Sequence, residues 1–266
     1  MYCKVIDKKG RQAYNDQHEQ GRSSEEGRVS GSEACFPLMN ALTFWSDHDT
    51  KGEEAMLREG QVRIPSGCAV SGIFAKDGRR LSGEAIIKSI SIMHDRSNGL
   101  GGGFAGYGIY PEYKEHYAFH VFYDDKAAKE ACEKFIDDHF DVVNLSKIPV
   151  RKTPKITDEP LIWRYFVNPL PTKLKDSQLD EREYTARCVM RINTRIEGAY
   201  VFSSGKNMGV FKAVGYPEDV GDFYRLEEYS GYCWTAHGRY PTNTPGWWGG
   251  AHPFAMLDYS VVHNGE

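Results

Sequence analysis

The feature that most constrains this chain is a change of pattern at Cys68. Before it, the stretch from Gly10 to Ser32 is rich in Gly, Ser, Glu, Gln and Arg and has almost no apolar residues, so it has little with which to bury a core. From Cys68 onward, short apolar runs alternate with amphipathic segments and turn residues. We therefore predict a partly disordered leader at residues 1–67 and one folded domain at residues 68–266.

The folded part has strand patterns towards both ends and helical patterns between them, which predicts stacked sheets sandwiched by helices. Cys68–Ala75 has the apolar run of a buried strand, and Ser82 is placed to cap the helix that follows. Further strands are predicted at 107–110, 116–123, 161–167, 199–203, 209–214, 232–238 and 259–263, and further helices at 125–139 and 180–195.

Composition excludes several classes of protein. The 266 residues carry a net charge of −4, with 40% apolar and 26% charged residues, which gives no reason to expect nucleic acid or a membrane as a partner. The polar start lacks the apolar core of a secretory signal, and no apolar run approaches the roughly 18 residues of a membrane span. Six dispersed cysteines without a C-x-x-C pair predict reduced thiols and no metal site. We expect a cytoplasmic protein.

The glycine-rich run Asn98–Gly106 is predicted to be a loop. Within it, Gly101–Gly106 matches G-x-G-x-x-G, but the run follows a helix. A dinucleotide site needs a strand, then the loop, then a helix, because the pyrophosphate rests on the helix N-terminus. We expect no nucleotide there.

Two side chains have the chemistry of a reactive pocket. The thiol of Cys68 can act as a nucleophile if a base lies nearby, although most cysteines that begin a strand are only small apolar residues. Arg239 follows a strand-like alternation and so emerges at a strand end. There its guanidinium can bind a carboxylate through two parallel hydrogen bonds, and an exposed or structural arginine is the alternative.

Asn264 and Gly265 end an apolar strand. Asn-Gly is the commonest two-residue hairpin turn, and taken alone this pair favours a hairpin. In the functional interpretation, the Asn264 amide and the Gly265 N–H donate to a developing oxyanion. Loss of one such donor typically costs about 3–4 kcal/mol of transition-state stabilisation.

Together these segments resemble the class II glutamine amidotransferases, which are N-terminal-nucleophile hydrolases with a four-layer αββα fold of two antiparallel sheets flanked by helices. Cys68-Ala-Val-Ser-Gly-Ile-Phe is similar to the start of that domain, Cys-Gly-Ile-x-Gly, and Met93-His-Asp-Arg is similar to its His-Arg-Gly segment. His237-Gly-Arg-Tyr-Pro-Thr-Asn-Thr, Trp247 and His263-Asn-Gly-Glu are similar to the glutamate synthase branch. The resemblance covers 68–124 and about 196–266, so the stretch around 125–195 reads as an insertion.

The resemblance implies a role for each matching residue. Cys68 matches the nucleophile that attacks the glutamine side-chain amide, with its own α-amino group as the base, since α-amines titrate near pH ~8. Arg239 matches the residue that binds the substrate α-carboxylate, and Thr242 a second glutamine contact. Asn264 and Gly265 match the oxyanion hole.

The chain departs from the family pattern at several positions. Ala69 replaces a glycine, and Pro241 replaces a serine. Ser97 stands where the glycine of Arg-Gly is expected, which leaves the role of Arg96 open. The family's acidic residue for the substrate ammonium lies beyond Glu266, so we expect the domain to be truncated at its C-terminus.

An N-terminal nucleophile cannot use its amine as a base while that amine is a peptide nitrogen. We therefore expect the Gly67–Cys68 bond to be cleaved by attack of the Cys68 thiol on the Gly67 carbonyl, which makes residues 1–67 a propeptide.

The expected activity is hydrolysis of L-glutamine to glutamate and ammonia through a Cys68 thioester. Ammonia would pass to a glutamate synthase-type partner subunit or domain, and FMN and an iron–sulfur cluster are expected on that partner rather than here. One alternative is the glutaminase of an amidotransferase with a different ammonia acceptor. Another is a non-catalytic module in which the leader blocks Cys68.

Overall fold

The computed structural model describes residues 67–241 and 244–264. The predicted leader before Gly67, the predicted glutamine contact Thr242 and the predicted oxyanion donor Gly265 lie outside these residues. In the part of the chain that is described, no helix combines the length and apolar character needed to cross a membrane.

One antiparallel sheet has the order β1-β10-β3-β8. Its strands are β1 (Ala69–Phe74), β10 (Cys233–Gly238), β3 (Gly102–Tyr107) and β8 (Met208–Ala213). β10 and β3 lie in the middle and are buried along their whole length. β1 is an edge strand, so the nucleophile candidate precedes an edge of this sheet.

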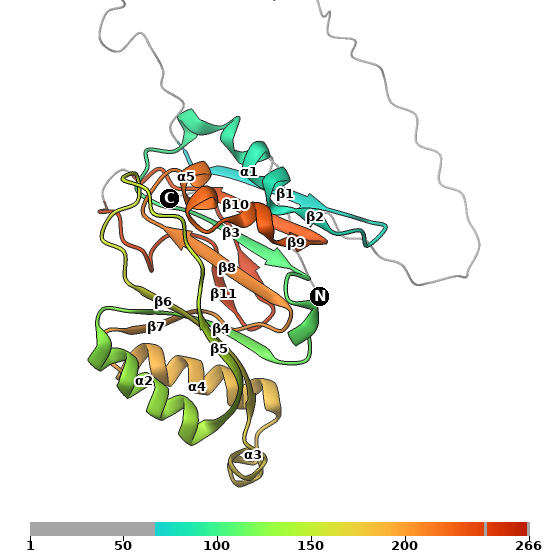
Figure 1. Ribbon diagram of the computed structural model, residues 1–266, viewed down its shortest axis with the longest axis vertical. Coiled ribbons are helices and arrows are strands. Elements are labelled where there is room, and N and C mark those ends of the chain that lie inside the picture. The colour runs from blue at the N-terminus through green and yellow to red at the C-terminus, as the bar shows by residue number, and fades with distance from the viewer. Residues whose placement is uncertain (1–66, 242–243, 265–266) are drawn as a thin grey trace, which may run out of the picture. The chain divides into compact units, whose positions relative to one another are not determined.

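Two helices cover one face of this sheet, α1 (Gly83–Ser91) and α5 (Pro217–Phe223). α1 begins as predicted, because the Ser82 hydroxyl accepts a hydrogen bond from the Glu84 N–H at 3.2 Å. Its apolar residues Ile86 and Ile90 are buried against the sheet. Both helices lie above β10 and β3 in Figure 1.

A second antiparallel sheet has the order β5-β6-β4-β7. Its strands are β5 (Phe140–Lys147), β6 (Leu161–Pro169), β4 (Tyr117–Tyr123) and β7 (Ala199–Ser203). Odd-numbered residues of β4 join the core formed with α2 (Lys126–His139) and α4 (Glu181–Arg195), whereas Ala118 and Phe122 join the other core. This alternation follows from the two-residue period of a strand.

The two sheets are connected where the β3–β8 pair continues into the β4–β7 pair. β3 pairs with β8 up to Tyr107 opposite Met208, and an isolated bridge between Tyr117 and Lys206 continues towards the pairing of β4 with β7. Each sheet carries its own pair of helices, with α1 and α5 at one side and α2 and α4 at the other (Figure 1). The predicted α+β fold of antiparallel sheets flanked by helices is confirmed.

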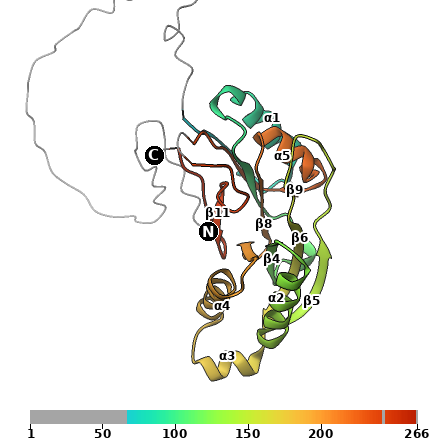
Figure 2. The same ribbon diagram turned by 90° about the vertical axis from the view of Figure 1, so that its left-hand side faces the viewer.

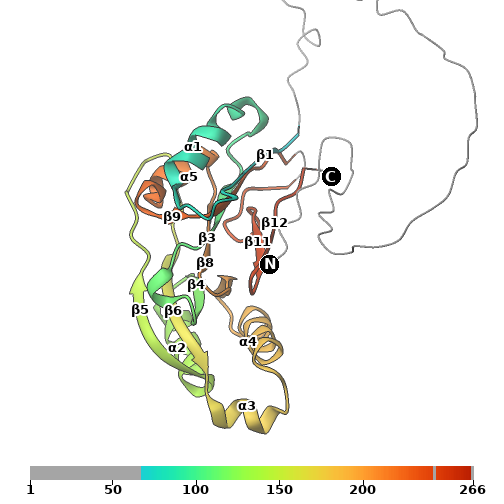
Figure 3. The ribbon, with the colours of Figure 1, turned by 90° about the vertical axis from the view of Figure 1, so that its right-hand side faces the viewer.

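The C-terminal part of the described chain adds a hairpin, β11 (Phe254–Met256) paired with β12 (Tyr259–Val261). This hairpin lies on the side of β3 and β8 opposite α1 and α5, as Figures 2 and 3 show from two directions. The remaining elements are short: β2 (Leu81–Ser82), η1 (His94–Arg96), η2 (Pro111–Tyr113), α3 (Pro171–Ser177), η3 (Leu226–Glu228) and β9 (Ser230–Gly231).

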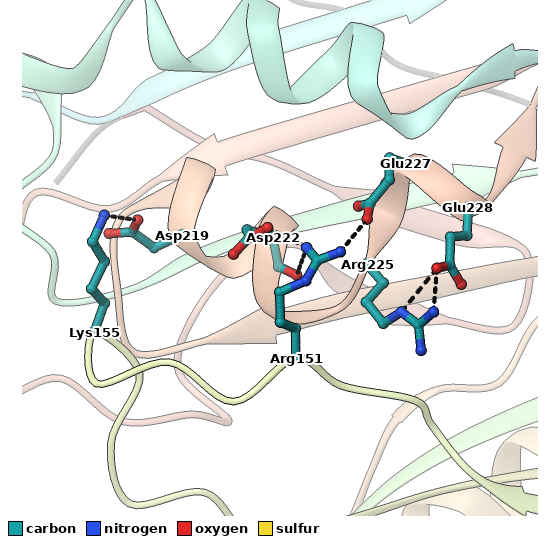
Figure 4. A network of polar contacts seen from close by, with 7 residues as sticks. All are labelled: Arg151, Lys155, Asp219, Asp222, Arg225, Glu227 and Glu228. Carbon is teal, nitrogen blue, oxygen red and sulfur yellow. Dashed lines mark hydrogen bonds and ion pairs between the residues drawn. The ribbon is translucent and has the colours of Figure 1, made fainter.

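The segment that connects β5 to β6 is held against α5 and η3 by ion pairs, which Figure 4 shows from close by. The Arg151 guanidinium contacts Asp222 and, at 2.7 Å, Glu227. Lys155 pairs with Asp219 at 2.7 Å. Exposed pairs of this kind contribute little stability each, so their effect here is to fix the course of a segment that lacks regular structure.

Two predictions of local structure are wrong. A strand was expected at 107–110, but only Tyr107 belongs to a strand, as the last residue of β3, and residues 108–110 lie outside it. The glycine run Asn98–Gly106 was expected to be a loop, but its second half forms β3 in the middle of a sheet. A Cβ on Gly103 would collide with the His252 carbonyl, and a Cβ on Gly106 would lie 2.6 Å from the Trp234 ring. The glycines therefore serve close packing on a strand, which composition alone does not distinguish from a loop.

Among the α-helices and the strands longer than two residues, four had no sequence prediction: β5, α3, α5 and β11. The stretch predicted as an insertion supplies α2, β5, β6, α3 and α4, so it builds much of the second sheet and its helices. Its assignment as an insertion stays a prediction.

Candidate active site

Cys68 and Arg239 lie side by side although they are distant in sequence. β1 and β10 are antiparallel with Ala69 opposite Gly238, so Cys68 and Arg239 each lie one residue beyond the paired strands. The backbone N–H of Tyr240 donates a hydrogen bond to the Cys68 sulfur at 3.5 Å. The Cys68 thiol is free and only partly buried, as a nucleophile must be if a substrate is to reach it.

The Arg239 backbone is fixed from two directions. Its N–H donates to the Gly101 carbonyl at 2.7 Å, and its own carbonyl accepts from the Ser97 hydroxyl at 3.1 Å. Ser97 is the residue that departs from the family's expected glycine, and its hydroxyl here anchors the strand end. No sequence pattern predicted this contact.

The Arg239 side chain rests in the loop that follows it. Its Nη2 donates to the Thr244 hydroxyl at 2.7 Å and its Nη1 donates to the Pro245 carbonyl at 3.3 Å. A guanidinium has five N–H donors, so these two bonds leave donors for a ligand carboxylate. The loop residues thus orient the guanidinium.

Asn264 and Arg96 both lie beside Gly67. A Cβ built on Gly67 would be 2.9 Å from Arg96 Nη2 and 3.4 Å from Asn264 Oδ1. Gly67 also has a φ of +125°, a backbone conformation that strongly favours glycine. The junction between Gly67 and Cys68 therefore lies between a guanidinium and a side-chain amide, and Arg96 joins the candidate residues.

The position of Asn264 is linked to a buried histidine on β10. His237 is fully buried, and its Nε2 lies 2.7 Å from the His263 carbonyl oxygen. A carbonyl only accepts, so Nε2 carries the proton and donates it. His237 thereby fixes the peptide that leads directly into Asn264.

His237 is paired with a second histidine, His252. The two rings stack with centroids 4.4 Å apart, and the Nδ1 atoms of both are buried without a hydrogen-bond partner among the described residues. Burial lowers the pKa of His237 to about 4 and that of His252 to about 3, because a protonated ring at either position would be a cation shielded from water. Both rings are neutral at physiological pH.

Three of the predicted site residues, Cys68, Arg239 and Asn264, come together at one end of β1 and β10 with Gly67. Thr242 and Gly265 lie outside the described residues. Within residues 67–241 and 244–264, no three His, Cys, Asp or Glu side chains gather into a possible metal site.

A separate cavity of about 670 Å³ does not include Cys68, Arg239 or Asn264. It lies between the end of α4 and the loop that holds Arg239, and Trp247 and Gly249 form part of its lining. Residues of this loop thus both contact the Arg239 side chain and line the cavity.

Residues 108–266 match a known protein family, described as the class II glutamine amidotransferases. A protein of Archaeoglobus fulgidus described as uncharacterized is 54% identical over 202 residues, which are 75% of this chain and 53% of that protein. The chain therefore spans about half the length of this relative.

Proposed function

Because the chain belongs to the class II glutamine amidotransferases, we propose that it hydrolyses L-glutamine to L-glutamate and ammonia through a thioester on Cys68. The observation that supports this most is the convergence of the free Cys68 thiol, Arg239 and Asn264 at one end of the β1–β10 pair. These residues supply a nucleophile, a carboxylate-binding cation and an oxyanion donor, the three functions that acyl transfer from glutamine requires.

The proposed reaction begins when the Cys68 sulfur adds to the γ-amide carbon and the thiol proton passes to the Cys68 α-amine. The Asn264 amide and the Gly265 N–H would bind the oxyanion that forms. The C–N bond then breaks, the leaving nitrogen takes the proton, and ammonia departs. Water adds to the γ-glutamyl thioester, the C–S bond breaks, and glutamate leaves with the thiol restored.

Arg239 would hold the substrate by its α-carboxylate. Its guanidinium keeps donors free beyond those used by Thr244 and Pro245. Thr242, three residues further along the chain, would add the second glutamine contact.

We further propose that the Gly67–Cys68 bond is cut by the Cys68 thiol itself. The thiol would add to the Gly67 carbonyl, the peptide C–N bond would break, and the thiol proton would pass to the Cys68 nitrogen, which leaves as the α-amine. Water would then hydrolyse the resulting thioester, which releases the leader as a carboxylic acid and restores the thiol. The glycine at 67 leaves this carbonyl unhindered, and the Asn264 side chain and the Arg96 guanidinium lie close enough to the junction to stabilise charge there. Removal of the leader frees the α-amine that serves as the base.

The ammonia acceptor is proposed to be a glutamate synthase-type subunit or domain. The tail motif of His237–Thr244 with His263-Asn-Gly-Glu supports that branch of the family. FMN and an iron–sulfur cluster would reside on that partner, which would use the ammonia to aminate 2-oxoglutarate.

The decisive experiment measures glutamine-dependent ammonia release by the full chain and by its Cys68→Ala variant, with mass analysis of each N-terminus. We expect release by the unmodified chain only, with Cys68 as its first residue. Equal release by both proteins would refute the thioester mechanism. A fully active protein that retains Met1 would refute the processing step.

The two alternatives predict other results. A glutaminase that serves a different acceptor would release ammonia and glutamate from glutamine. It would not support conversion of 2-oxoglutarate to glutamate when mixed with an FMN-containing synthase partner. A module blocked by its leader would release no ammonia and would keep its N-terminus intact.

A further inference from the structure

Lys212 on β8 is a fully buried lysine with no carboxylate beside it among the described residues. Its ammonium donates one hydrogen bond, to the Gly249 carbonyl at 2.9 Å. Aromatic rings supply the rest of its surroundings: Nζ lies 4.8 Å from the centroid of Phe254 and 5.4 Å from that of Tyr200. Cation–π contacts of this kind offset part of the cost of burial.

A buried lysine of this kind is unfavourable for folding alone. Burying an ammonium without an ion-pair partner costs free energy that an apolar residue at the same strand position would not incur. Burial accordingly lowers the pKa of Lys212 to about 7. The Lys212 ammonium lowers the stability of the fold, and its hydrogen bond is to a carbonyl of the loop that contains Gly249. These two observations favour a role for Lys212 in the position of that loop.

The loop in question runs from Thr244 to Ala251 and surrounds the Arg239 side chain. Thr244 and Pro245 accept hydrogen bonds from the guanidinium, and the position of a Cβ on Gly250 would be 3.8 Å from Arg239 Nη1. The loop closes on itself through a hydrogen bond from the Gly250 N–H to the Trp247 carbonyl.

Two interior anchors hold the far side of this loop. One is Lys212, bonded to Gly249. The other is Trp248, which is buried against Phe122 and whose indole N–H donates to the Thr157 carbonyl at 3.2 Å. The two contacts fix adjacent residues of the loop, Trp248 and Gly249. Of the two, only the contact to Gly249 comes from a charged group.

Strand register explains why the lysine reaches the loop. Lys212 lies opposite Gly103, and Gly103 lies opposite His237 on the next strand. The three residues form a row on one face, and the His252 carbonyl fills the gap that the glycine leaves. The chain from Gly249 to Phe254 therefore passes between Lys212 and His237. Lys212 donates a hydrogen bond to the Gly249 carbonyl, and His237 donates one to the His263 carbonyl, which precedes Asn264.

We propose that Lys212 is a positioning residue for the glutamine pocket: its ammonium holds Gly249 so that the loop aims the Arg239 guanidinium at the substrate α-carboxylate. This rests on the proposed glutaminase function and adds to it a residue that does not itself touch substrate. Lys212 acts on recognition of the carboxylate and not on the thiol chemistry.

The test compares two substrates, L-glutamine and 4-aminobutanamide, which is glutamine with its α-carboxylate replaced by hydrogen. Lys212→Met keeps the apolar stem and removes the ammonium. We expect the KM for L-glutamine to rise about tenfold or more, with kcat nearly unchanged. The kcat/KM for 4-aminobutanamide should stay as in the unsubstituted protein. Lys88→Met, the same change on the exposed face of α1, should alter neither substrate.

A folded Lys212→Met protein with an unchanged KM for L-glutamine, or with equal losses for both substrates, would overturn the proposal. If the unsubstituted chain shows no Cys68-dependent ammonia release, the glutaminase function and the Lys212 role fail together. If it is active, a negative result with Lys212→Met removes the Lys212 role alone.

A second measurement does not depend on that variant folding. In Cys68→Ala protein freed of residues 1–67 and labelled with ¹⁵Nζ-lysine, we expect the Lys212 signal to titrate well below the signals of exposed lysines, because burial lowers its pKa. Saturating L-glutamine should shift this signal, and 4-aminobutanamide should leave it in place. An unmoved signal with bound L-glutamine would also overturn the proposal.

Discussion

At the scale of single residues, the backbone of the candidate site is held in place by the polar side chains of Ser97 and His237. His237 donates from Nε2 to the His263 carbonyl, and its neutral state is maintained by burial. Ser97 holds the Arg239 carbonyl. A reactive group placed by such contacts needs less reorganisation when charge develops, which is how preorganised sites gain rate.

Replacing His237 should impair catalysis rather than binding. In His237→Leu the peptide before Asn264 loses its hydrogen-bond donor. We expect kcat to fall on the order of 10- to 100-fold, because Asn264, the proposed oxyanion donor, is displaced. His237→Gln retains an N–H at a similar reach and should recover much of the rate. The KM for glutamine should change little in either variant, and steady-state kinetics with a thermal unfolding control will measure both effects. A drop in kcat that His237→Gln does not restore would argue against the hydrogen bond as the cause.

Arg239 should behave in the opposite manner. Arg239→Ala removes the bidentate contact proposed for the substrate α-carboxylate, and we expect the KM for glutamine to rise on the order of 100-fold. Arg239→Lys should recover little, since an ammonium does not reproduce the planar fork. Arg187→Ala, an exposed arginine on α4, is the matched control. An unchanged KM in Arg239→Ala would remove its assigned role.

At the scale of elements, β3 shows how a strand can be made from glycine. The strand is central and fully buried, and the backbone of the His252 segment lies directly against Gly103. The glycines weaken the strand intrinsically, but they allow the hairpin side of the sheet to approach closely. β3 thereby joins the sheet that carries Cys68 to the segment that carries Asn264.

This packing predicts a large difference between two glycine substitutions in one sheet. Gly103→Ala forces a Cβ into the His252 carbonyl and should destabilise the protein by about 2 kcal/mol or more. Gly72→Ala on β1 meets its nearest atom at 3.7 Å, an ordinary contact, and should change stability by less than about 1 kcal/mol. Urea unfolding of both variants will measure the difference. Equal stabilities would show that the backbone relaxes around residue 103.

Element prediction from sequence succeeded where periodicity was strong. The helices at Lys126–His139 and Glu181–Arg195 were predicted within a residue of their observed starts, because each has an aspartate cap and an apolar stripe. β5 was missed since its burial pattern is mostly exposed, and α5 was missed because it is a short helix rich in acidic residues. Neither has a periodic signal of its own, and both are fixed by neighbours distant in sequence.

At the scale of the whole molecule, the protein carries buried histidines that must stay neutral. His120 donates from Nδ1 to the Val210 carbonyl at 2.8 Å and accepts at Nε2 from the Tyr110 hydroxyl at 2.9 Å. Burial lowers the pKa of His120 to about 3, and that of His237 to about 4. An unfolded histidine titrates near ~6.5, so between these values the unfolded state binds more protons than the folded state.

Stability should therefore be full above pH ~6.5 and should fall as the pH drops below it towards 4. Each of these two histidines contributes a slope of about 1.4 kcal/mol per pH unit in that window. Urea unfolding at pH 7, 6 and 5 will measure the decline, and His120→Asn should reduce its slope by about one histidine's share. A free energy of unfolding that is constant from pH 7 to pH 5 would contradict the neutral assignment.

The candidate site was predictable from sequence in part. Cys68, Arg239 and Asn264 were identified from strand ends and a family motif, and the structure brings them together. Arg96 stayed open and Lys212 gave no signal. A lysine on a strand is ordinary in sequence, and only the closed space around its ammonium makes it unusual. Motifs mark residues that touch a substrate, whereas supporting residues become visible only through packing.

The pairing of β1 with β10 also has a consequence for the order in which the molecule assembles. The Cys68 sulfur and the Tyr240 N–H are 172 residues apart in the chain. During synthesis on a ribosome, β1, the strand that follows Cys68, has no partner strand until β10 has emerged. Contacts of such long range form slowly, because a large loop must close first. The junction at Gly67 therefore lacks its contact with Asn264 for most of synthesis. The self-cleavage proposed for this junction would then occur only after the two segments have folded together.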